Sequence, residues 1–447
     1  MLIIGDLYTF DIIGLTQDGC GIGMADGIKV FIEGVLPGEK VRGAITKIEA
    51  DYAAARLYEI IESKGDRVIP FCQYFHQCGG CSLQFIAYDQ QIIVKRGIVK
   101  EAVSRIAGID ADVVRETIGS VDTMNYRNKA QYPIQYAEGK CKLGFYKTRT
   151  RQVADIRFCS IQQKYSNDVR EAVRDYLDEM LQSKKVMASP IRHIVTRVSR
   201  KTGEVMMVLV TSLEELPSSE ELVEVITKRV PSIKSIYINH NNKNTNQVMG
   251  EENKLIFGKE KIMDSIGCYD FEISPLSFFQ VNSKQTEVLY DKIREFAGLT
   301  GIETVLDLYC GTGTISIYLS DVAGSVIGIE SIEEAVKDAE NNMKINRVKN
   351  TRFVCGRVEH VIGQINDRID VVIVDPPRKG CKKEVLDEIV RISPARIVYV
   401  SCNPSTMAAD VNYLKESGYG VKVIQPVDMF PHTAHVECVT LITRADK

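Results

Sequence analysis

From residue 303 onward, short apolar runs alternate with helical stretches, and each run ends in glycine or polar residues. The runs and their endings are Val305-Leu306-Asp307-Leu308 before Tyr309-Cys310-Gly311-Thr312-Gly313, Val326-Ile327-Gly328-Ile329 before Glu330, Val371-Val372-Ile373-Val374 before Asp375-Pro376-Pro377-Arg378, and Ile397-Val398-Tyr399-Val400 before Ser401-Cys402-Asn403-Pro404. Apolar runs closed by turn residues are typical of buried parallel strands. Ligands of open α/β sheets bind beyond the carboxyl ends of such strands. The pattern predicts a doubly wound, Rossmann-like α/β domain over residues 276–447, with Cys402 at the rim of a cleft.

The rest of the chain is long enough for two further units. Residues 1–63 hold short β-prone runs separated by Gly- and Pro-containing turns, which predicts a small OB-like barrel. Gly19-Cys20-Gly21-Ile22-Gly23 and Val35-Leu36-Pro37-Gly38-Glu39-Lys40-Val41 in it resemble a TRAM domain, an RNA-binding barrel of RNA-modifying enzymes. Residues 64–275 are predicted to form a central α+β domain. Its helical part near 86–118 is expected to pack on the C-terminal domain.

Composition narrows the class of protein. No apolar run approaches the roughly 20 residues that span a bilayer, and the N-terminus lacks the features of a signal peptide. We therefore expect a cytoplasmic protein that does not bind membranes. In such a chain, the 12 cysteines indicate metal binding or catalysis rather than a disulfide framework.

The net charge of −3 argues against nucleic-acid binding, but the charge is unevenly distributed. Between residues 127 and 157, basic residues outnumber Glu138 and Asp155, and aromatic residues are interleaved with them. The basic residues are Arg127, Lys129, Lys140, Lys142, Lys147, Arg149, Arg151 and Arg157, and the aromatic ones are Tyr126, Tyr132, Tyr136, Phe145 and Tyr146. Cations neutralise phosphates and rings stack on unpaired bases. The stretch predicts RNA binding, with a solvated, charged sheet face as the alternative.

Three cysteines, Cys72, Cys78 and Cys81, have the spacing C-x5-C-x2-C, and Gly79 and Gly80 allow a tight fold between the last two. Four thiolates suit zinc or an iron–sulfur cluster, so a fourth ligand is needed. Cys159 is the best candidate, with His76 as a competitor. The site is interpreted as structural, because four cysteines leave no open coordination position.

The glycines of the first α/β turn, Gly311 and Gly313, allow a nucleoside-bearing ligand to approach the backbone. The turn is not the G-x-G-x-x-G of dinucleotide binders. Glu330 ends the next strand, where a carboxylate accepts hydrogen bonds from ribose hydroxyls. Together these features indicate S-adenosylmethionine as the cofactor. Glu330 as an ordinary surface acid, and Cys402 as one more small buried hydrophobe, are the structural alternatives.

Five motifs together resemble the RNA uracil-C5 methyltransferase family: Phe278-Phe279-Gln280-Val281-Asn282, Asp307-Leu308-Tyr309-Cys310-Gly311, Asp375-Pro376-Pro377-Arg378, Ser401-Cys402-Asn403-Pro404 and His435-Val436-Glu437. The barrel and the cysteines resemble its ribosomal-RNA branch. The resemblance implies a [4Fe–4S] cluster on Cys72, Cys78, Cys81 and Cys159. It also implies cofactor contacts at Gln280, Tyr309, Glu330 and Asp375. Arg357 departs from the family, which usually has Asp or Asn near the adenine, so we leave it out of the site.

The chemistry of the reaction gives these residues roles. Uracil C5 is too weakly nucleophilic to take a methyl group until a thiolate adds to C6, and Cys402 is the candidate nucleophile. Glu437 is the candidate base for the C5 proton. Asp375 would orient the ring or the cofactor, and Phe278 is expected to stack on the flipped base.

We therefore expect a monomeric enzyme that methylates uridine C5 in 23S ribosomal RNA. The alternatives are a transfer-RNA uridine-C5 methyltransferase and a non-catalytic RNA-binding assembly factor. The presence of both Cys402 and Glu437 argues against the second alternative.

Overall fold

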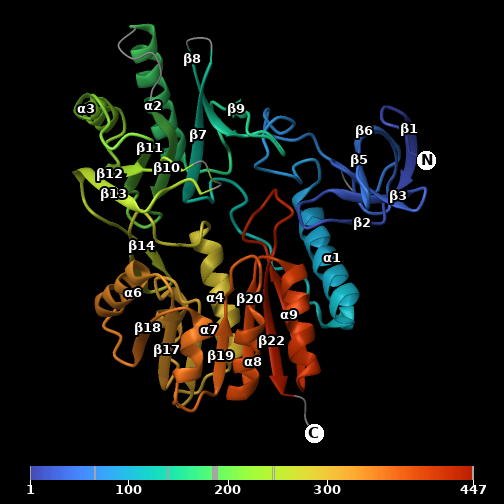
Figure 1. The fold of residues 1–447 in the computed structure, drawn as a ribbon, viewed down its shortest axis with the longest axis vertical. Helices are drawn as coiled ribbons and strands as arrows, with labels where there is room; N and C mark the ends of the chain where they lie inside the picture. Colours follow the sequence, from blue (N-terminus) through green and yellow to red (C-terminus); the bar gives the residue numbers. More distant parts are fainter. Residues whose placement is uncertain are drawn as a thin grey trace.

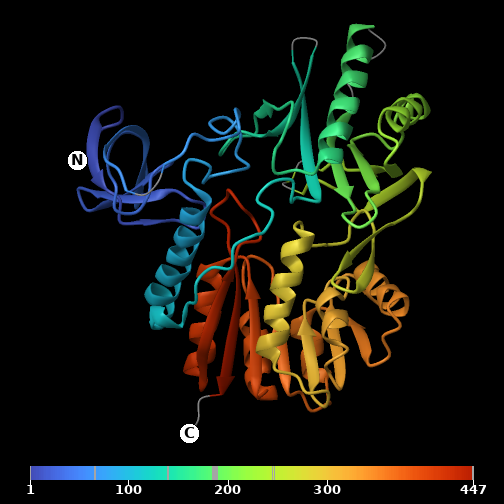
Figure 2. The same ribbon diagram turned by 180° about the vertical axis from the view of Figure 1, so that it is seen from behind.

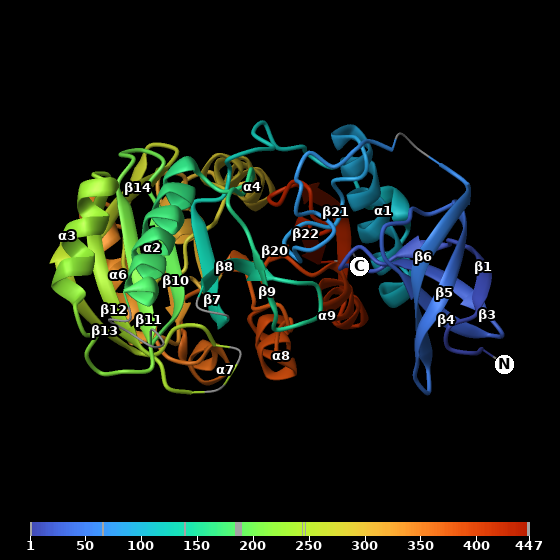
Figure 3. The same cartoon turned by 90° about the horizontal axis from the view of Figure 1, so that it is seen from above.

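The computed structural model describes residues 2–64, 67–137, 140–183, 190–243, 245 and 247–444. In Figure 1 an N-terminal β unit (blue, upper right) and a central α/β unit (green, upper left) lie above a C-terminal α/β unit (orange to red). The view from above separates the two upper units clearly (Figure 3). None of the described helices is both long and apolar enough to cross a membrane.

The N-terminal unit is a six-stranded sheet in the order β1-β5-β6-β4-β3-β2. Its strands are β1 Leu7–Asp11, β2 Gly14–Leu15, β3 Gly21–Ala25, β4 Ile28–Ile32, β5 Lys40–Ile48 and β6 Tyr52–Glu62. A Cβ on Gly21 would lie 2.1 Å from Val35 Cγ2, and one on Gly23 would lie 3.0 Å from Phe10 Cβ. The glycines of the Gly-x-Gly motif therefore let the strand approach a core that contains Phe10, Val30 and Val41.

The central unit contains a seven-stranded sheet in the order β13-β12-β11-β10-β7-β8-β9. Its elements are β7 Lys129–Ala137, β8 Lys140–Tyr146, β9 Val153–Asp155, α2 Lys164–Gln182, β10 Ile191–Val198, β11 Val205–Thr211, α3 Ser219–Arg229, β12 Ile233–His240 and β13 Glu252–Gly258. Helix α2 packs Val169, Val173 and Leu177 into the core of this unit. The hairpin of β14 Ile262–Ile266 and β15 Tyr269–Ile273 follows and contacts helices of the C-terminal unit.

The basic stretch 127–157 contributes β7, β8 and β9 to this sheet. Tyr126, directly before this stretch, and Tyr132 within it are buried, and the Tyr126 hydroxyl donates a hydrogen bond to the carbonyl of Pro431 at 3.0 Å. These two rings are part of the core and cannot stack on bases. The interleaving of cations and rings in the sequence partly reflects a sheet with one buried face.

The C-terminal sheet has the order β18-β17-β16-β19-β20-β22-β21, and β22 runs antiparallel to both of its neighbours. The strands are β16 Thr304–Leu308, β17 Ser325–Glu330, β18 Thr351–Cys355, β19 Val371–Val374, β20 Arg396–Ser401, β21 Tyr419–Val427 and β22 Glu437–Arg444. The helices are α4 Ser283–Ala297, α5 Thr314–Leu319, α6 Glu333–Ile345, α7 Val358–Val361, α8 Lys383–Ile392 and α9 Pro404–Glu416. All four residues of β19 are fully buried, because apolar side chains cover both faces. The predicted α/β fold of this part is confirmed.

Helix α1, Tyr88–Ala107, precedes the central unit in sequence but packs against α9 of the C-terminal unit (Figure 2). Its Val99 and Val103 join the core beneath the C-terminal sheet. The helix predicted near 86–118 ends earlier, at Ala107, where Gly108 takes the left-handed conformation with φ 56°. The chain beyond it instead forms isolated β-bridges from Val114 and Ile118 to Ile424 and Val427 of β21.

Candidate active site

The candidate residues of the C-terminal sheet lie together at the carboxyl ends of its parallel strands. We call this end of the sheet the sheet edge. In the parallel part of the sheet, Leu308 pairs with Val374, and Val374 pairs with Tyr399. Strand β22 is antiparallel, so its first residue lies at the edge where the parallel strands end. Its Cys438 pairs with Ser401, which brings Glu437 opposite Cys402. The structure thus brings Asp375, Cys402 and Glu437 to the same end of the sheet.

The two groups that face each other have shifted pKa values. Burial, followed by the charge of Asp375, raises the pKa of Glu437 to about 8. Burial, followed by the charge of Glu437, raises the pKa of the Cys402 thiol to about 11. Burial also raises the pKa of Asp375 to about 7. Without substrate, the site therefore favours the uncharged forms of the thiol and of Glu437 at neutral pH.

Arg378 opposes both shifts. Its charge lowers the pKa of Cys402 and of Glu437, and it hydrogen-bonds to the Cys402 side chain. Arg378 belongs to the motif Asp375-Pro376-Pro377-Arg378, but the sequence analysis assigned it no role. Its place just after Asp375-Pro376-Pro377, at the same sheet edge, was the available signal. A guanidinium beside a thiol is a means of stabilising the thiolate.

Asn403 holds the turn that presents Cys402. Its side-chain oxygen caps helix α9 by accepting from the N–H of Ser405 at 3.1 Å, and its amide nitrogen donates to the Arg378 carbonyl at 3.0 Å. Pro404 occupies the first turn of the helix, where a missing N–H costs nothing. The sequence Ser-Cys-Asn-Pro is therefore a strand end joined to a capped helix, and it also fixes the loop that carries Arg378.

The glycine-rich turn after β16 contacts the end of β17. Tyr309, Gly311 and Gly313 have positive φ values of 65°, 55° and 76°. The N–H of Gly311 donates to Glu330 Oε2 at 3.1 Å, and the N–H groups of Ser331 and Ile332 donate to Oε1 at 2.6 and 2.9 Å. These bonds hold the Glu330 carboxylate at the strand end, where a ribose would be recognised.

A cavity of about 340 Å³ adjoins this turn and is lined by Tyr309, Ser331, Arg357, Val358, Glu359 and Lys382. Arg357, which we left out of the site, lines it. Lys382 Nζ lies 2.7 Å from Glu359 Oε1. Of the four expected cofactor contacts, Tyr309 lines this cavity, whereas Gln280, Glu330 and Asp375 do not. Gln280 is buried, and its backbone carbonyl accepts a hydrogen bond from Asn128 Nδ2 at 2.8 Å. Phe278, by contrast, is 65% exposed.

The four cysteines Cys72, Cys78, Cys81 and Cys159 line one small cavity of about 70 Å³, together with Arg127 and Gln162. His76 lies outside it and lines a different cavity. Burial raises the pKa of Cys78 to about 11 and that of Cys81 to about 12. Over the described residues, no group of three or more His, Cys, Asp or Glu side chains is arranged to hold a metal ion.

Buried polar atoms beside this cysteine cavity lack partners. Within the described part of the chain, Arg127 Nε, Gln162 Oε1, and Arg170 Nε and Nη1 have no hydrogen-bond partner. Cys159 is close enough to Arg170 to influence the pKa of its guanidinium. Arg170 also pairs with Glu171 through its Nη2, at 3.0 Å. Buried donors without partners are costly, so the remaining guanidinium nitrogens suit a neighbouring group that carries negative charge.

A larger cavity of about 820 Å³ lies between the N-terminal sheet and the cysteine segment, and it extends to Thr433 and His435. Arg56, His76 and Arg149 line it. Arg149 reaches from the β8–β9 turn to the N-terminal unit, where its Nε lies 3.6 Å from Glu33 Oε1 and its Nη2 donates to Cys20 Sγ at 2.9 Å. One cation of the basic stretch therefore joins two units across this cavity.

Comparison with known proteins gives consistent matches. A family model described as tRNA (uracil-5-)-methyltransferase matches residues 88–445. An uncharacterized RNA methyltransferase from Caldanaerobacter subterraneus subsp. tengcongensis is 45% identical, over 99% of this chain and 99% of the relative. Another, from Halalkalibacterium halodurans, is 43% identical, over 98% and 97%. The solved tRNA (uracil-54, C5)-methyltransferase of Pyrococcus abyssi, in complex with S-adenosyl-L-homocysteine, has a TM-score of 0.77 and 29% identity, over 98% of this chain and 100% of that one.

Proposed function

Because the chain belongs to the tRNA (uracil-5-)-methyltransferase family, and is thus an S-adenosylmethionine-dependent RNA (uracil-5-)-methyltransferase, we propose that it methylates uridine C5 through a covalent adduct on Cys402. The observation that carries this proposal is the meeting of Cys402, Glu437 and Arg378 at one sheet edge. A thiol opposite a buried carboxyl, with a guanidinium beside both, matches the needs of adduct formation and proton removal.

In the proposed mechanism, Arg378 favours release of the Cys402 proton to water, and the thiolate adds to uracil C6. The bond pair of C5=C6 moves toward C5, which becomes enolate-like. S-adenosylmethionine, when bound, would supply the methyl group to C5 as an electrophile and would leave as S-adenosylhomocysteine. Glu437, in its carboxylate form, then takes the proton from C5, and the electrons of that C–H bond re-form C5=C6. The C6–S bond breaks and returns Cys402 to its thiolate form.

The cofactor is proposed to bind at the turn after β16, where the cavity beside Tyr309 and the fixed carboxylate of Glu330 fit a nucleoside. Glu330 would accept hydrogen bonds from the ribose hydroxyls. Gln280 and Asp375 are proposed to contact the part of the cofactor nearest the thiol, because Asp375 lies on that side. Phe278, exposed on the loop before α4, is proposed to stack on the base.

The four cysteines are proposed to hold a [4Fe–4S] cluster. Support comes from their common cavity and from the unpaired guanidinium nitrogens of Arg127 and Arg170 nearby, which a negatively charged cluster would compensate. In a cluster each thiolate binds a different iron, so the sulfurs stand further apart than around a single ion. The proposed role is structural: the thiolates would join the segment 72–81 to the loop that carries Cys159.

We expect anaerobically purified protein to contain iron and acid-labile sulfide and to absorb visible light. Replacing Cys81 by Ser should remove the colour, whereas replacing the exposed Cys268 should leave it unchanged. Stoichiometric zinc without sulfide would contradict the cluster assignment.

The proposed substrate is 23S ribosomal RNA, and the support is the cysteine set and barrel that resemble the ribosomal-RNA branch. Residues 1–63 would be a TRAM-like RNA-binding barrel, 64–275 the cluster domain and 276–447 the methyltransferase domain of a monomer. Transfer RNA is the second candidate, favoured by the likeness over the whole chain to a transfer-RNA enzyme. Mapping 5-methyluridine in both RNAs, from cells with and without the gene, distinguishes them.

The mechanism is tested with Cys402→Ala and Glu437→Gln. Cys402→Ala should abolish methyl transfer to RNA but leave cofactor binding nearly intact. Glu437→Gln should stop after methyl transfer, as a denaturation-resistant protein–RNA adduct that carries the new methyl group. The double variant should form no adduct, and Cys268→Ala should behave as wild type. A fully active Glu437→Gln enzyme that traps no RNA would show that another group is the base.

A further inference from the structure

The loop that leads into Glu437 is anchored by residues that the proposed mechanism does not use. It runs from Asp428 to Val436 between β21 and β22, and is longer than ordinary hairpin connections of two to five residues. In Figure 1 it rises (red) from the sheet edge toward the N-terminal and central units. Glu437 is the first strand residue after it, opposite Val427. The conformation of this β21–β22 loop therefore bears directly on the position of Glu437.

The first anchor comes from the segment that follows the third cysteine. The N–H groups of Ser82 and Leu83 both donate to the His432 carbonyl at 3.0 Å. The Ser82 hydroxyl oxygen accepts from the N–H of Ala434, also at 3.0 Å. Ser82 thus contacts the loop on both sides of Thr433, and the loop cannot slide without breaking both contacts.

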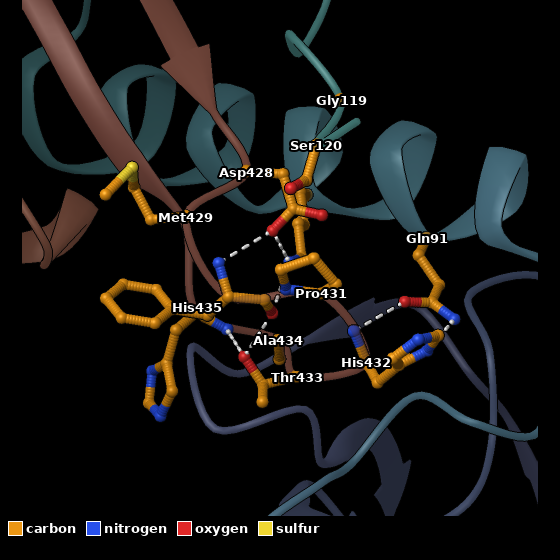
Figure 4. Close-up of polar contacts among 12 residues, drawn as sticks. Gln91, Gly119, Ser120, Asp428, Met429, Pro431, His432, Thr433, Ala434 and His435 are labelled. Atoms are coloured by element: carbon orange, nitrogen blue, oxygen red, sulfur yellow. Dashed lines mark hydrogen bonds and ion pairs between the residues drawn. The ribbon is translucent and has the colours of Figure 1, made fainter. Parts of the chain in front are cut away.

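The second anchor comes from helix α1. The Gln91 side chain accepts from the His432 N–H at 2.9 Å, and its amide nitrogen lies 3.2 Å from His432 Nδ1 (Figure 4). Gln91 is buried, and its amide nitrogen also donates to the Ile86 carbonyl at 3.1 Å. The amide is therefore held in one orientation and serves His432 through both its oxygen and its nitrogen.

The base of the loop is closed by a buried ion pair. Lys95 Nζ lies 2.5 Å from Asp428 Oδ1 and donates to the Phe430 carbonyl at 3.0 Å, and both side chains are fully buried. Tyr88 donates to Asp428 Oδ2 at 2.8 Å. Breaking this pair would leave a buried charge uncompensated and would destabilise the whole protein. The hydrogen bonds of Ser82 and Gln91, by contrast, can be removed by substitution without breaking this ion pair.

We propose that Ser82 and Gln91 are positioning residues for proton removal: they hold the β21–β22 loop so that the Glu437 carboxylate meets the C5 proton. Ser82 directly follows Cys81. A change in the conformation of the cysteine segment would therefore be transmitted to Glu437 through the contact of Ser82 with the loop. The inference rests on the proposed function, in which Glu437 is the base. Because adduct formation and methyl transfer precede proton removal, a displaced loop slows the last step and leaves the earlier ones intact.

The test uses Ser82→Ala, which removes the acceptor for the Ala434 N–H, and Ser82→Thr, which keeps a hydroxyl there. Ser199→Ala is the matched control, because Ser199 accepts the N–H of Thr202 at 3.0 Å in the turn between β10 and β11. We expect Ser82→Ala to lower kcat about tenfold, to leave the KM for S-adenosylmethionine within about twofold, and to accumulate methylated, denaturation-resistant adduct at steady state. Ser82→Thr should restore turnover, and Ser199→Ala should accumulate none.

Two results would overturn the inference. One is a Ser82→Ala enzyme whose turnover matches that of Ser199→Ala. The other is a slow Ser82→Ala enzyme without adduct, because the defect would then precede methyl transfer. Should Ser82→Ala not fold, Gln91→Leu is expected to accumulate the same adduct, and its failure to do so would count equally against the inference.

A second measurement separates this inference from the proposed function. Hydrogen exchange of the peptide covering residues 428–437 should be faster in Ser82→Ala than in Ser199→Ala, whether or not an RNA substrate is in hand. Equal exchange would overturn the anchoring. Wild-type protein that transfers no methyl group to any RNA, but has an anchored loop, would instead contradict the proposed function.

Discussion

At the scale of single residues, the site depends on a balance between burial and charge. Cys402 and Glu437 lie where burial favours their neutral forms, although the proposed reaction needs the thiolate first and the carboxylate later. Arg378 is the group that shifts this balance toward the charged forms. Binding of a polar base and cofactor would change the same balance, since it alters what surrounds both groups.

Arg378→Gln is expected to raise the pKa of Cys402 further above its ordinary value, because the largest opposing charge is removed. Alkylation of Cys402 by iodoacetamide, followed by peptide mass spectrometry between pH 7 and 10, should be slower and should need higher pH. Arg391→Gln is the control, since Arg391 pairs with Glu388 on helix α8 instead. Identical pH profiles for the two variants would mean that Arg378 does not act on the thiol.

Glu437→Gln should change how stability depends on pH. The folded protein holds the Glu437 proton up to a pKa of about 8, whereas the unfolded chain releases it near pH 4.3. Wild-type stability should therefore fall as the pH rises from about 4 to about 8, by a few kcal/mol at most. Glu437→Gln has no proton to release, so its stability lacks this dependence on pH. The Tm of the variant minus the Tm of the wild type should therefore increase between pH 5 and 8.5. Glu295→Gln is the control, because ion pairing lowers the pKa of Glu295; an advantage that stays constant with pH would contradict the shift.

At the scale of elements, the turn between β16 and α5 shows how close packing selects glycine. A Cβ on Gly313 would lie 2.6 Å from Phe353 Cζ and 3.0 Å from Ala339 Cβ, and its φ is positive. Phe353 belongs to β18, the edge strand of the sheet. The turn that is proposed to bind the cofactor is thus packed tightly against the outer strand β18. Position 313 cannot hold a residue larger than glycine unless the turn rearranges.

Gly313→Ala should destabilise the protein by roughly 1–3 kcal/mol and weaken binding of S-adenosylhomocysteine, because both the φ strain and the contact with Phe353 displace the turn. Gly420→Ala on β21 is the control, since a Cβ there meets nothing within 4 Å. Thermal denaturation and calorimetric titration measure the two effects. A Gly313→Ala protein that binds as tightly as Gly420→Ala would argue against this turn as the cofactor site.

At the scale of the whole molecule, the cavity of about 820 Å³ joins the N-terminal sheet to the loop that carries His435. Basic residues from two units, Arg56 and Arg149, line it. The cavity reaches His435, two residues before Glu437, and we propose that it holds the RNA chain on one side of the target uridine. Arg149 is already engaged by Glu33, so its contribution to RNA binding depends on that acid.

Arg56→Gln should weaken RNA binding and reduce the slope of log affinity against log salt by about one, because one phosphate contact is lost. Glu33→Gln should act in the opposite direction, since it frees Arg149. Arg229→Gln is the control, because Arg229 pairs with Asp175 and Glu179 on helix α2. Filter binding at several salt concentrations measures the slopes, and unchanged slopes in the first two variants would place the RNA elsewhere.

The sequence alone determined the α/β class of residues 276–447 and the sheet edge on which the candidate residues lie. Apolar runs ending at Glu330, Asp375 and Cys402 are local patterns, and parallel strands align their ends wherever the chain goes between them. The convergence of Cys402 and Asp375 followed from this rule. The turn chemistry of Asn403 and Pro404 was equally local.

Only the tertiary structure decided what surrounds those groups. Charges act through space, so the effect of Arg378 on Cys402 and Glu437 depends on loop conformation rather than on spacing in the sequence. Tyr126 and Tyr132 have the same pattern as exposed stacking rings, yet they are buried, because burial depends on which face of the sheet the rest of the chain covers. Gln91 and His432 are 341 residues apart in the sequence, and the contact of Ser82 with His432 spans a similar separation. No local pattern encodes such a distance, and only the packed fold brings these groups together.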